Sequence, residues 1–135
     1  MKRTAMEAEL RRFFDEHLQW VMDRVPPRVH QLLEDVTMYI EDYPSTAIMR
    51  QMGVRRRDAL CGLYTGIPLT RRHVEVSGVL SDAIYIYREG ILAMATDRSG
   101  DIDPAELRRQ IRITVLHELG HHHGIDESAL EELGY

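Results

Sequence analysis

Cysteine and long apolar runs are scarce in this sequence. Cys61 is the single cysteine among 135 residues, so no disulfide can form within the chain, which is typical of a reducing compartment. No apolar run approaches the roughly 18–20 residues of a membrane span. Acidic residues between positions 7 and 16 interrupt the N-terminus, where a signal peptide would be apolar throughout. We therefore expect a cytoplasmic protein that is not associated with a membrane.

Positive charge is also in deficit. The chain has 17 Lys and Arg against 22 Asp and Glu, a net charge of −5, and non-specific nucleic-acid binding needs a clustered basic field. We therefore expect no nucleic-acid partner. The basic run at residues 55–57 has two interpretations, an anion site or a solvated turn, and the turn is favoured. The length predicts one domain over residues 1–135, too short for an enzyme with a separate dinucleotide-binding half.

The distribution of apolar residues predicts an α+β fold. An amphipathic N-terminal helix is expected over residues 4–24, within a segment 1–25, with Thr4 and Glu7 as its capping box. Pro26 and Pro27 end that helix and start a short second one. Three strands are predicted, over residues 36–40, 59–64 and 81–88, with a long loop over 43–57, a short helix over 89–96 and a turn over 97–103. The expected architecture is a single compact domain in which a short mixed sheet packs on helices.

A second long helix is predicted over residues 104–123. Asp103 suits the N-cap, Pro104 the first helical position and Glu106 the capping box, while Gly124 suits the residue after the C-cap. The second half of this helix is apolar except for one imidazole and one carboxylate. Burying such groups costs free energy unless they are paired or bind a metal, so their presence requires a reason.

Histidines supply that reason. Four of the seven in the chain fall within residues 117–123. His117 and His121, four residues apart, lie about 40° from each other around a helix and can reach one ion. Glu118 lies beside the pair and can act as general base for a water bound to the metal. This HExxH arrangement is typical of zinc metallopeptidases; a histidine-rich helix end stabilised by the helix dipole would not explain the carboxylate.

A catalytic zinc site needs a third protein ligand. Continuing the spacing, Gly124 lets the chain turn and Glu127, three residues later, can return to the ion. Asp126 is an alternative, as is a ligand from another segment. His122 and His123 also compete, but a regular helix directs them away from His121.

Longer segments around this motif resemble a known family. HELGHHHGIDESALEELGY at residues 117–135, with ALCGLYTGIPLTRR and DAIYIYR upstream, is similar to the small bacterial zincin-like metallopeptidases, over roughly residues 29–135. The resemblance implies a compact domain around a zinc motif with an acidic third ligand. His117, Glu118, His121 and Gly124 match the motif directly, whereas Glu127 replaces the usual Asp.

The predicted function is hydrolysis of peptide bonds by zinc-activated water, with peptides or unfolded proteins as substrates. A second electrophile is expected, and Tyr64, Arg88, His122 and His123 are the candidates. Their alternative roles are packing for Tyr64, a surface charge for Arg88 and a solvated helix end for the histidines. Substrate is expected to add as a strand along a sheet edge.

Two other functions remain open. A ribonuclease-like metal hydrolase would use three regularly spaced histidines, and Glu127 breaks that pattern. A non-catalytic zinc-binding interaction module would use the broad apolar stripe of the N-terminal helix, with Phe13, Phe14 and Trp20, for a partner or a dimer; core packing is the favoured use of that stripe. A structural zinc site has no need of a buried carboxylate that is not a ligand, so Glu118 favours the enzyme.

Overall fold

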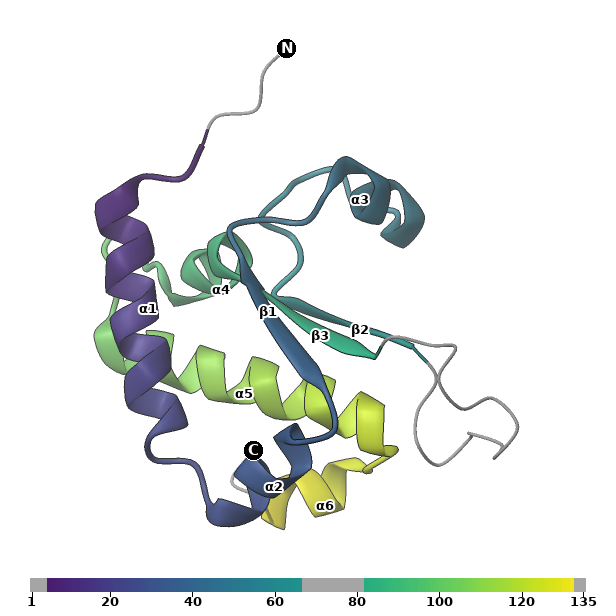
Figure 1. Ribbon diagram of the computed structural model, residues 1–135. Coiled ribbons are helices and arrows are strands. Elements are labelled where there is room, and N and C mark those ends of the chain that lie inside the picture. The colour runs from purple at the N-terminus through teal and green to yellow at the C-terminus, as the bar shows by residue number, and fades with distance from the viewer. Residues whose placement is uncertain (1–4, 67–81, 133–135) are drawn as a thin grey trace.

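The computed structural model describes residues 5–66 and 82–132. Within these residues the chain forms the helices and strands labelled in Figure 1. Their order and bounds are α1 (Ala8–Met22), α2 (Pro27–Leu33), β1 (Thr37–Glu41), α3 (Thr46–Met52), β2 (Gly62–Thr65), β3 (Ala83–Tyr87), α4 (Arg88–Ala95), α5 (Pro104–His123) and α6 (Glu127–Glu132). None of the described helices combines the length and the apolar character that crossing a membrane would require.

The three described strands form one mixed sheet in the order β1-β3-β2. β3 is central and pairs in parallel with β1 and antiparallel with β2, so that Tyr85 lies opposite both Tyr39 and Leu63. The predicted α+β class and short mixed sheet are therefore confirmed. β2 begins at Gly62 rather than at residue 59, because the preceding residues form turns.

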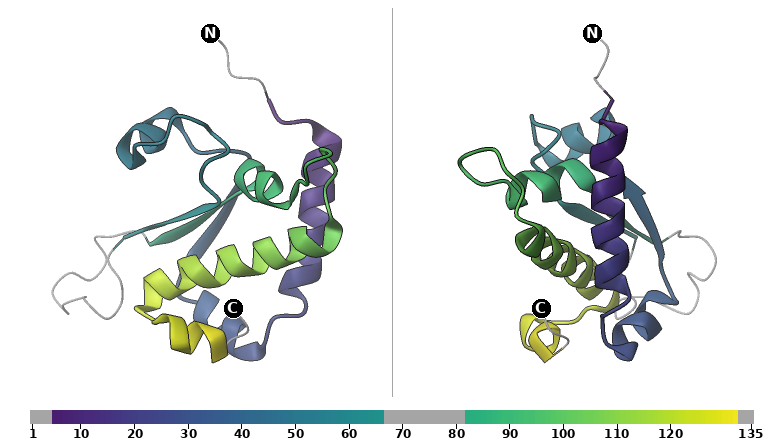
Figure 2. Two further views of the ribbon diagram at one scale, coloured as in Figure 1. Left: turned by 180° about the vertical axis from the view of Figure 1, so that it is seen from behind. Right: turned by 90° about the vertical axis from the view of Figure 1, so that its left-hand side faces the viewer.

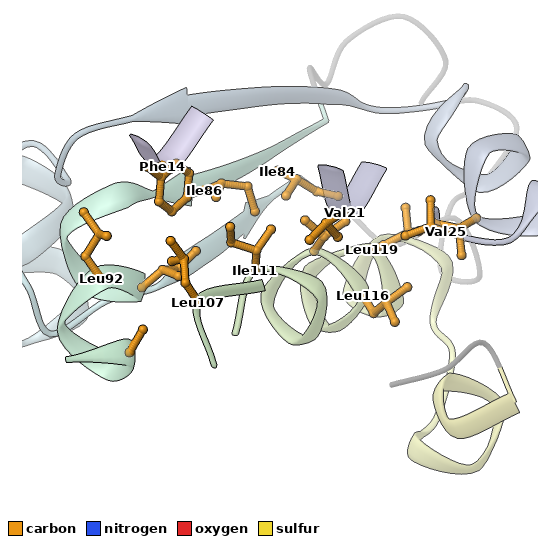
Figure 3. Packing of buried hydrophobic residues seen from close by; sticks show 14 of the residues in the cluster. Phe14, Val21, Val25, Ile84, Ile86, Leu92, Leu107, Ile111, Leu116 and Leu119 are labelled. Carbon is orange, nitrogen blue, oxygen red and sulfur yellow. The ribbon is translucent and has the colours of Figure 1, made fainter. Parts of the chain in front are cut away.

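The core lies between the sheet and α5, which runs along one face of the sheet and is crossed by α1 near its N-terminal half (Figures 1 and 2). Ile84 and Ile86 on β3 are fully buried and face Ile111 of α5, while Phe14 enters from α1 (Figure 3). Burying an aliphatic or aromatic side chain of this size contributes about 1.5–3 kcal/mol. This packing holds α5 in a fixed position against β2 and β3.

The ends of α5 follow the sequence prediction with one exception. Asp103 is the N-cap and its carboxylate accepts a hydrogen bond from the Ala105 amide at 3.1 Å, while Gly124 ends the helix with a φ of 64°. Glu106 does not complete a capping box: its carboxylate accepts from Gln110 at 2.8 Å, and the Asp103 amide donates to a carbonyl of α4. Because the Asp103 amide already donates to this carbonyl of another helix, it does not need the Glu106 carboxylate as an acceptor.

The start of α1 differs from the prediction. The helix begins at Ala8, and Glu7 is its N-cap in an extended conformation rather than a residue of the first turn. Thr4, the other predicted member of the capping box, lies outside the described residues. Met6 is buried in the core, and the extended backbone at Glu7 carries the chain from that buried side chain into the helix.

The predicted loop over residues 43–57 was wrong in its centre, which contains α3. Ser45 caps this helix by accepting a hydrogen bond from the Ile48 amide at 3.1 Å, and Gly53 ends it with a φ of 71°. No residue of α3 is buried, so the segment has no apolar stripe for periodicity to detect. Its two end signals were the only indication available.

The basic run after α3 forms a turn, as favoured. Arg56 is exposed and pairs with Asp58 at 2.8 Å. Arg57 differs, because it is half-buried, pairs with Glu89 of α4 at 2.7 Å and stacks on the Tyr43 ring at 4.1 Å. These contacts give Arg57 a structural role in fastening the turn to α4.

Candidate metal centre and active site

His117 and His121 project side by side from the second half of α5. Both residues are exposed, and their ring centroids are 4.5 Å apart. Partial burial, together with the neighbouring His117 ring, lowers the pKa of the His121 imidazole below its usual 6.5. Because a histidine binds metal in its neutral form, this shift favours the state that can act as a ligand.

Glu118 occupies the opposite environment, although it is next in sequence. The residue is only 7% exposed because it faces the sheet. Burial raises the pKa of its carboxyl to about 7, and a hydrogen bond from the Tyr64 backbone acts in the opposite direction. One carboxylate oxygen lies 3.5 Å from Nδ1 of His121. A carboxyl with a pKa near neutrality, close to one of two exposed imidazoles, is suited to accept and release a proton.

Gly62 is the reason that β2 can lie so close to Glu118. A Cβ atom at this position would be 2.8 Å from Cγ2 of Thr114 and 3.1 Å from Cγ of Glu118, and 3.0 Å from the backbone oxygen of Tyr85. Only glycine lets the strand and the helix approach to this distance without displacing one of them. The contact explains the burial of Glu118 from the β2 side.

The chain beyond α5 turns back toward the helix that carries the histidines. Gly124 adopts the left-handed conformation, and the Ile125 amide donates to the carbonyl of Gly120 at 2.9 Å. α6 then packs on α5, where the buried Leu130 fits against Gly120; a Cβ atom there would be 3.1 Å from a Leu130 methyl. The turn predicted at Gly124 is therefore present.

The two acidic candidates for the third ligand follow this turn. Asp126 uses its carboxylate to accept a hydrogen bond from the Ala129 amide at 2.9 Å, which places it as a cap of α6. Glu127 is the first residue of α6, and its side chain lies outside what the structure describes. Among the described side chains, no three His, Cys, Asp or Glu residues are grouped closely enough to hold a metal ion.

Residues 33–135 match the zincin-like metallopeptidase family, which is well over half of the chain. The chain belongs to this family. No curated protein matches the sequence. Membership confirms the resemblance found from the motif, and it implies a metal ion at the site and peptides as the substrate class.

The residues of the zincin-like site fit such an ion. Two neighbouring imidazoles, one of them with a depressed pKa, are nitrogen ligands that zinc prefers. The adjacent carboxylate of Glu118 is held on the sheet side of the helix, and the turn at Gly124 directs the chain back to α5. In this zincin-like chain, His117, Glu118 and His121 therefore lie together in the second half of α5.

His122 and Tyr64, two of the candidate electrophiles, lie together in the interior. His122 is fully buried, and its ring packs edge-on against the Tyr64 ring, with centroids 5.6 Å apart. Its Nδ1 lies 3.6 Å from a carboxylate oxygen of the buried Asp82. The alternative interpretation of His122 as a solvated helix end was wrong, because helix periodicity turns it toward the sheet at the point where β3 begins. Asp82 escaped the sequence analysis; a lone acid directly before an apolar strand was its only signal.

His123 and Arg88 make contacts away from Glu118. Nε2 of His123 lies 2.7 Å from the carbonyl oxygen of Leu32 in α2. Arg88 donates to Asp15 of α1 and to Asp42, each at 2.9 Å, and its side chain is only 12% exposed. The surface-charge interpretation of Arg88 was therefore wrong: β3 leads directly into α4, and the guanidinium is drawn into an ion-pair network with α1.

Proposed function

We propose that this chain is a zinc-dependent peptidase in which His117, His121 and Glu127 hold the metal and Glu118 is the general base. The observation that carries the proposal is the burial of Glu118. Its carboxylate faces the sheet beside a pair of exposed imidazoles, although burying a carboxyl group costs free energy. A structural metal site would not require that cost, whereas a hydrolase requires a base beside its ligands.

In this mechanism the chain contributes ligands, a base and a surface for the substrate. Zinc, when bound, supplies a Lewis acid that polarises the scissile carbonyl and makes water more acidic. The Glu118 carboxylate accepts the proton of the attacking water and then delivers it to the amine that leaves. A pKa of about 7 in the metal-free protein supports both transfers near neutral pH, because neither protonation state is strongly disfavoured.

Glu127 is preferred over Asp126 as the third ligand on structural grounds. The Asp126 carboxylate already caps α6, and using it for the metal would remove that cap. Glu127 follows directly, on a helix that Leu130 fastens against α5. Its extra methylene relative to the usual Asp lengthens the reach to an ion held by the histidines.

We further propose that extended peptides bind along β2. Within the described part of the chain, β2 pairs with β3 on one side and with no strand on the other, and α5 packs against this strand. The Tyr64 backbone acts on the Glu118 carboxyl from this strand. A peptide added to that edge would place its carbonyl groups next to the base, in the strand-addition mode of peptide recognition.

The first test is the variant Glu118→Gln, which keeps the size of the side chain and removes the base. We expect about one zinc per chain by elemental mass spectrometry, and peptide hydrolysis reduced by about 10²–10⁴-fold. Glu9→Gln, at an exposed position of α1, is the matched control and should retain full activity. Hydrolysis by Glu118→Gln at the wild-type rate would exclude Glu118 as base, and loss of zinc would make it a ligand instead.

The second test concerns the ligands. His121→Ala should abolish stoichiometric zinc, whereas His30→Ala, at an exposed histidine of α2, should keep it. Glu127→Ala should lower the affinity for zinc and Asp126→Ala should not, apart from a small loss of α6 stability. If His121→Ala binds zinc as wild type does, the assignment of the site is wrong. Wild-type protein that binds zinc and cleaves no peptide of a diverse library would instead support a non-catalytic module.

A further inference from the structure

A groove separate from the predicted site is lined by residues from the end of α1, the segment that follows it and the first half of α5. The two helices cross at one end of the molecule (Figure 1). The volume of the groove is about 380 Å³, within the range of ligand-binding pockets. Four arginines line it, Arg24 from the α1 side and Arg108, Arg109 and Arg112 from α5. None of the described residues that line it carries a carboxylate.

The positive charge of this groove is largely uncompensated. Among the described residues, neither Arg24 nor Arg112 forms an ion pair. Arg108 donates to Nδ1 of His17 at 3.0 Å, so this ring nitrogen carries no proton, and burial and the guanidinium both lower the pKa of the imidazole. Of the four arginines, Arg109 pairs with an acid in the part of the chain that the structure describes, with Glu106 at an exposed position. A protein with a net charge of −5 thus concentrates unpaired cations at one place.

Trp20 forms the apolar part of the groove in a fixed orientation. The guanidinium carbons of Arg24 and Arg108 both lie 4.0 Å from its ring centroid, so the indole is held between two cations. Trp20 is still 37% exposed, and Val21, Val25 and Pro26 continue the apolar lining. Rigid Trp and Arg side chains at the centre of a concave surface are typical of residues that dominate protein-binding energy.

We propose that this groove binds an acidic peptide segment that carries apolar side chains between its carboxylates. Arg108 and Arg112 are four residues apart, one helical turn or about 6 Å along α5. That distance matches the roughly 6.6 Å between side chains two residues apart on an extended peptide. The carboxylates would pair with the arginines, and the intervening apolar side chain would pack on the exposed edge of the Trp20 ring, between the two guanidinium groups. A nucleic acid is disfavoured, because its phosphates would meet the acidic remainder of the surface.

Binding here is independent of the hydrolytic site. Arg108 and Glu118 are ten residues apart on α5, about 15 Å. The α1 wall of the groove also precedes residues 33–135, which carry the family match. Success or failure of peptide binding at the groove can therefore be measured without any activity, and it leaves the proposed peptidase function untouched.

Trp20 is the single tryptophan of the chain, so its fluorescence reports on the groove directly. The probe is an acetylated, amidated peptide in which five residues alternate glutamate and leucine, and the control peptide has glutamine in place of glutamate. We expect a saturable change of Trp20 emission with the glutamate peptide, weakened by added salt, and none with the glutamine peptide. The Glu118→Gln protein should bind the probe as wild type does.

The decisive comparison uses two double variants that remove equal charge. Arg24→Gln/Arg112→Gln should raise the Kd by about tenfold, whereas Arg50→Gln/Arg55→Gln, at exposed positions on and after α3, should leave it within about twofold. Thermal melts establish that both proteins are folded. Equal weakening by both pairs, or no saturable response of the wild type, would overturn the proposal. Binding of a short oligonucleotide instead of the peptide, lost in the groove variant, would overturn it in favour of a nucleic-acid site.

Discussion

Replacing Gly62 by alanine should destabilise the protein and disturb α5, the helix that carries His117, Glu118 and His121. The new Cβ atom would approach Cγ2 of Thr114 to 2.8 Å and the Tyr85 carbonyl oxygen to 3.0 Å. Thr114 cannot rotate its methyl away freely, because its hydroxyl donates to the carbonyl of Gln110 at 2.8 Å. The strand or the helix must therefore move.

The expected cost combines two opposing effects. Overpacking of a filled interior costs typically 1–3 kcal/mol, or about 2 kcal/mol here. The lower conformational entropy of the unfolded alanine chain offsets about 0.4–1 kcal/mol of this. The net loss is about 1–2 kcal/mol, which for a chain of this length lowers Tm by roughly 4–7 °C. Urea unfolding followed by circular dichroism measures it.

A double-mutant cycle identifies the cause. Thr114→Ser removes the methyl group that Gly62→Ala would strike and retains the hydroxyl that donates to Gln110. In the Thr114→Ser protein, Gly62→Ala should cost at least ~0.5 kcal/mol less than in wild type. If Gly62→Ala is as stable as wild type, or if the costs of the two substitutions simply add, then the close approach of β2 and α5 at Thr114 does not require glycine at position 62.

Three further changes test other parts of the structure. Gly90→Ala should destabilise the fold by ~3 kcal/mol in urea unfolding, because its Cβ would overlap the Leu60 carbonyl oxygen; an unchanged midpoint would contradict the packing of α4. Arg11 and Arg88 hold the pKa of the Asp42 carboxyl in the folded protein below its usual 3.8. The ionised carboxylate therefore contributes fully to folding stability above pH 3.8, and this contribution is lost as the pH falls through the lower pKa of the folded state. Asp42→Asn should therefore flatten the acid limb of stability against pH, and an unchanged limb would count against the network. Leu130→Ala should raise the zinc Kd by about tenfold in a chelator competition, because α6 would loosen from Gly120; wild-type affinity would argue against a ligand on α6.

The sequence was sufficient where local chemistry sets the structure. The ends of α5 follow from Asp103, Pro104 and Gly124, because caps and left-handed turns depend on the residue itself. The HExxH spacing predicted a pair of histidines on one side of a helix, and the family match confirms the class of protein to which that motif belongs.

Tertiary structure decided the features that depend on distant segments. α3 has no buried face to give it a periodic signature, and the start of α1 depends on where Met6 is buried. Arg88 became an interior cation only because Asp15 and Asp42, far away in sequence, meet it.

The same division holds at the two sites. Sequence alone determined that Glu118 lies beside two histidines, since helix geometry fixes residues one and three apart. Its burial and raised pKa required Gly62 of β2 to pack against α5. The arginine-lined groove has no local signal at all, because Trp20 and Arg108 become neighbours only when α1 crosses α5. Contacts within one turn of a helix can be predicted from the spacing of residues in the sequence, whereas contacts between elements depend on the packing of the whole chain.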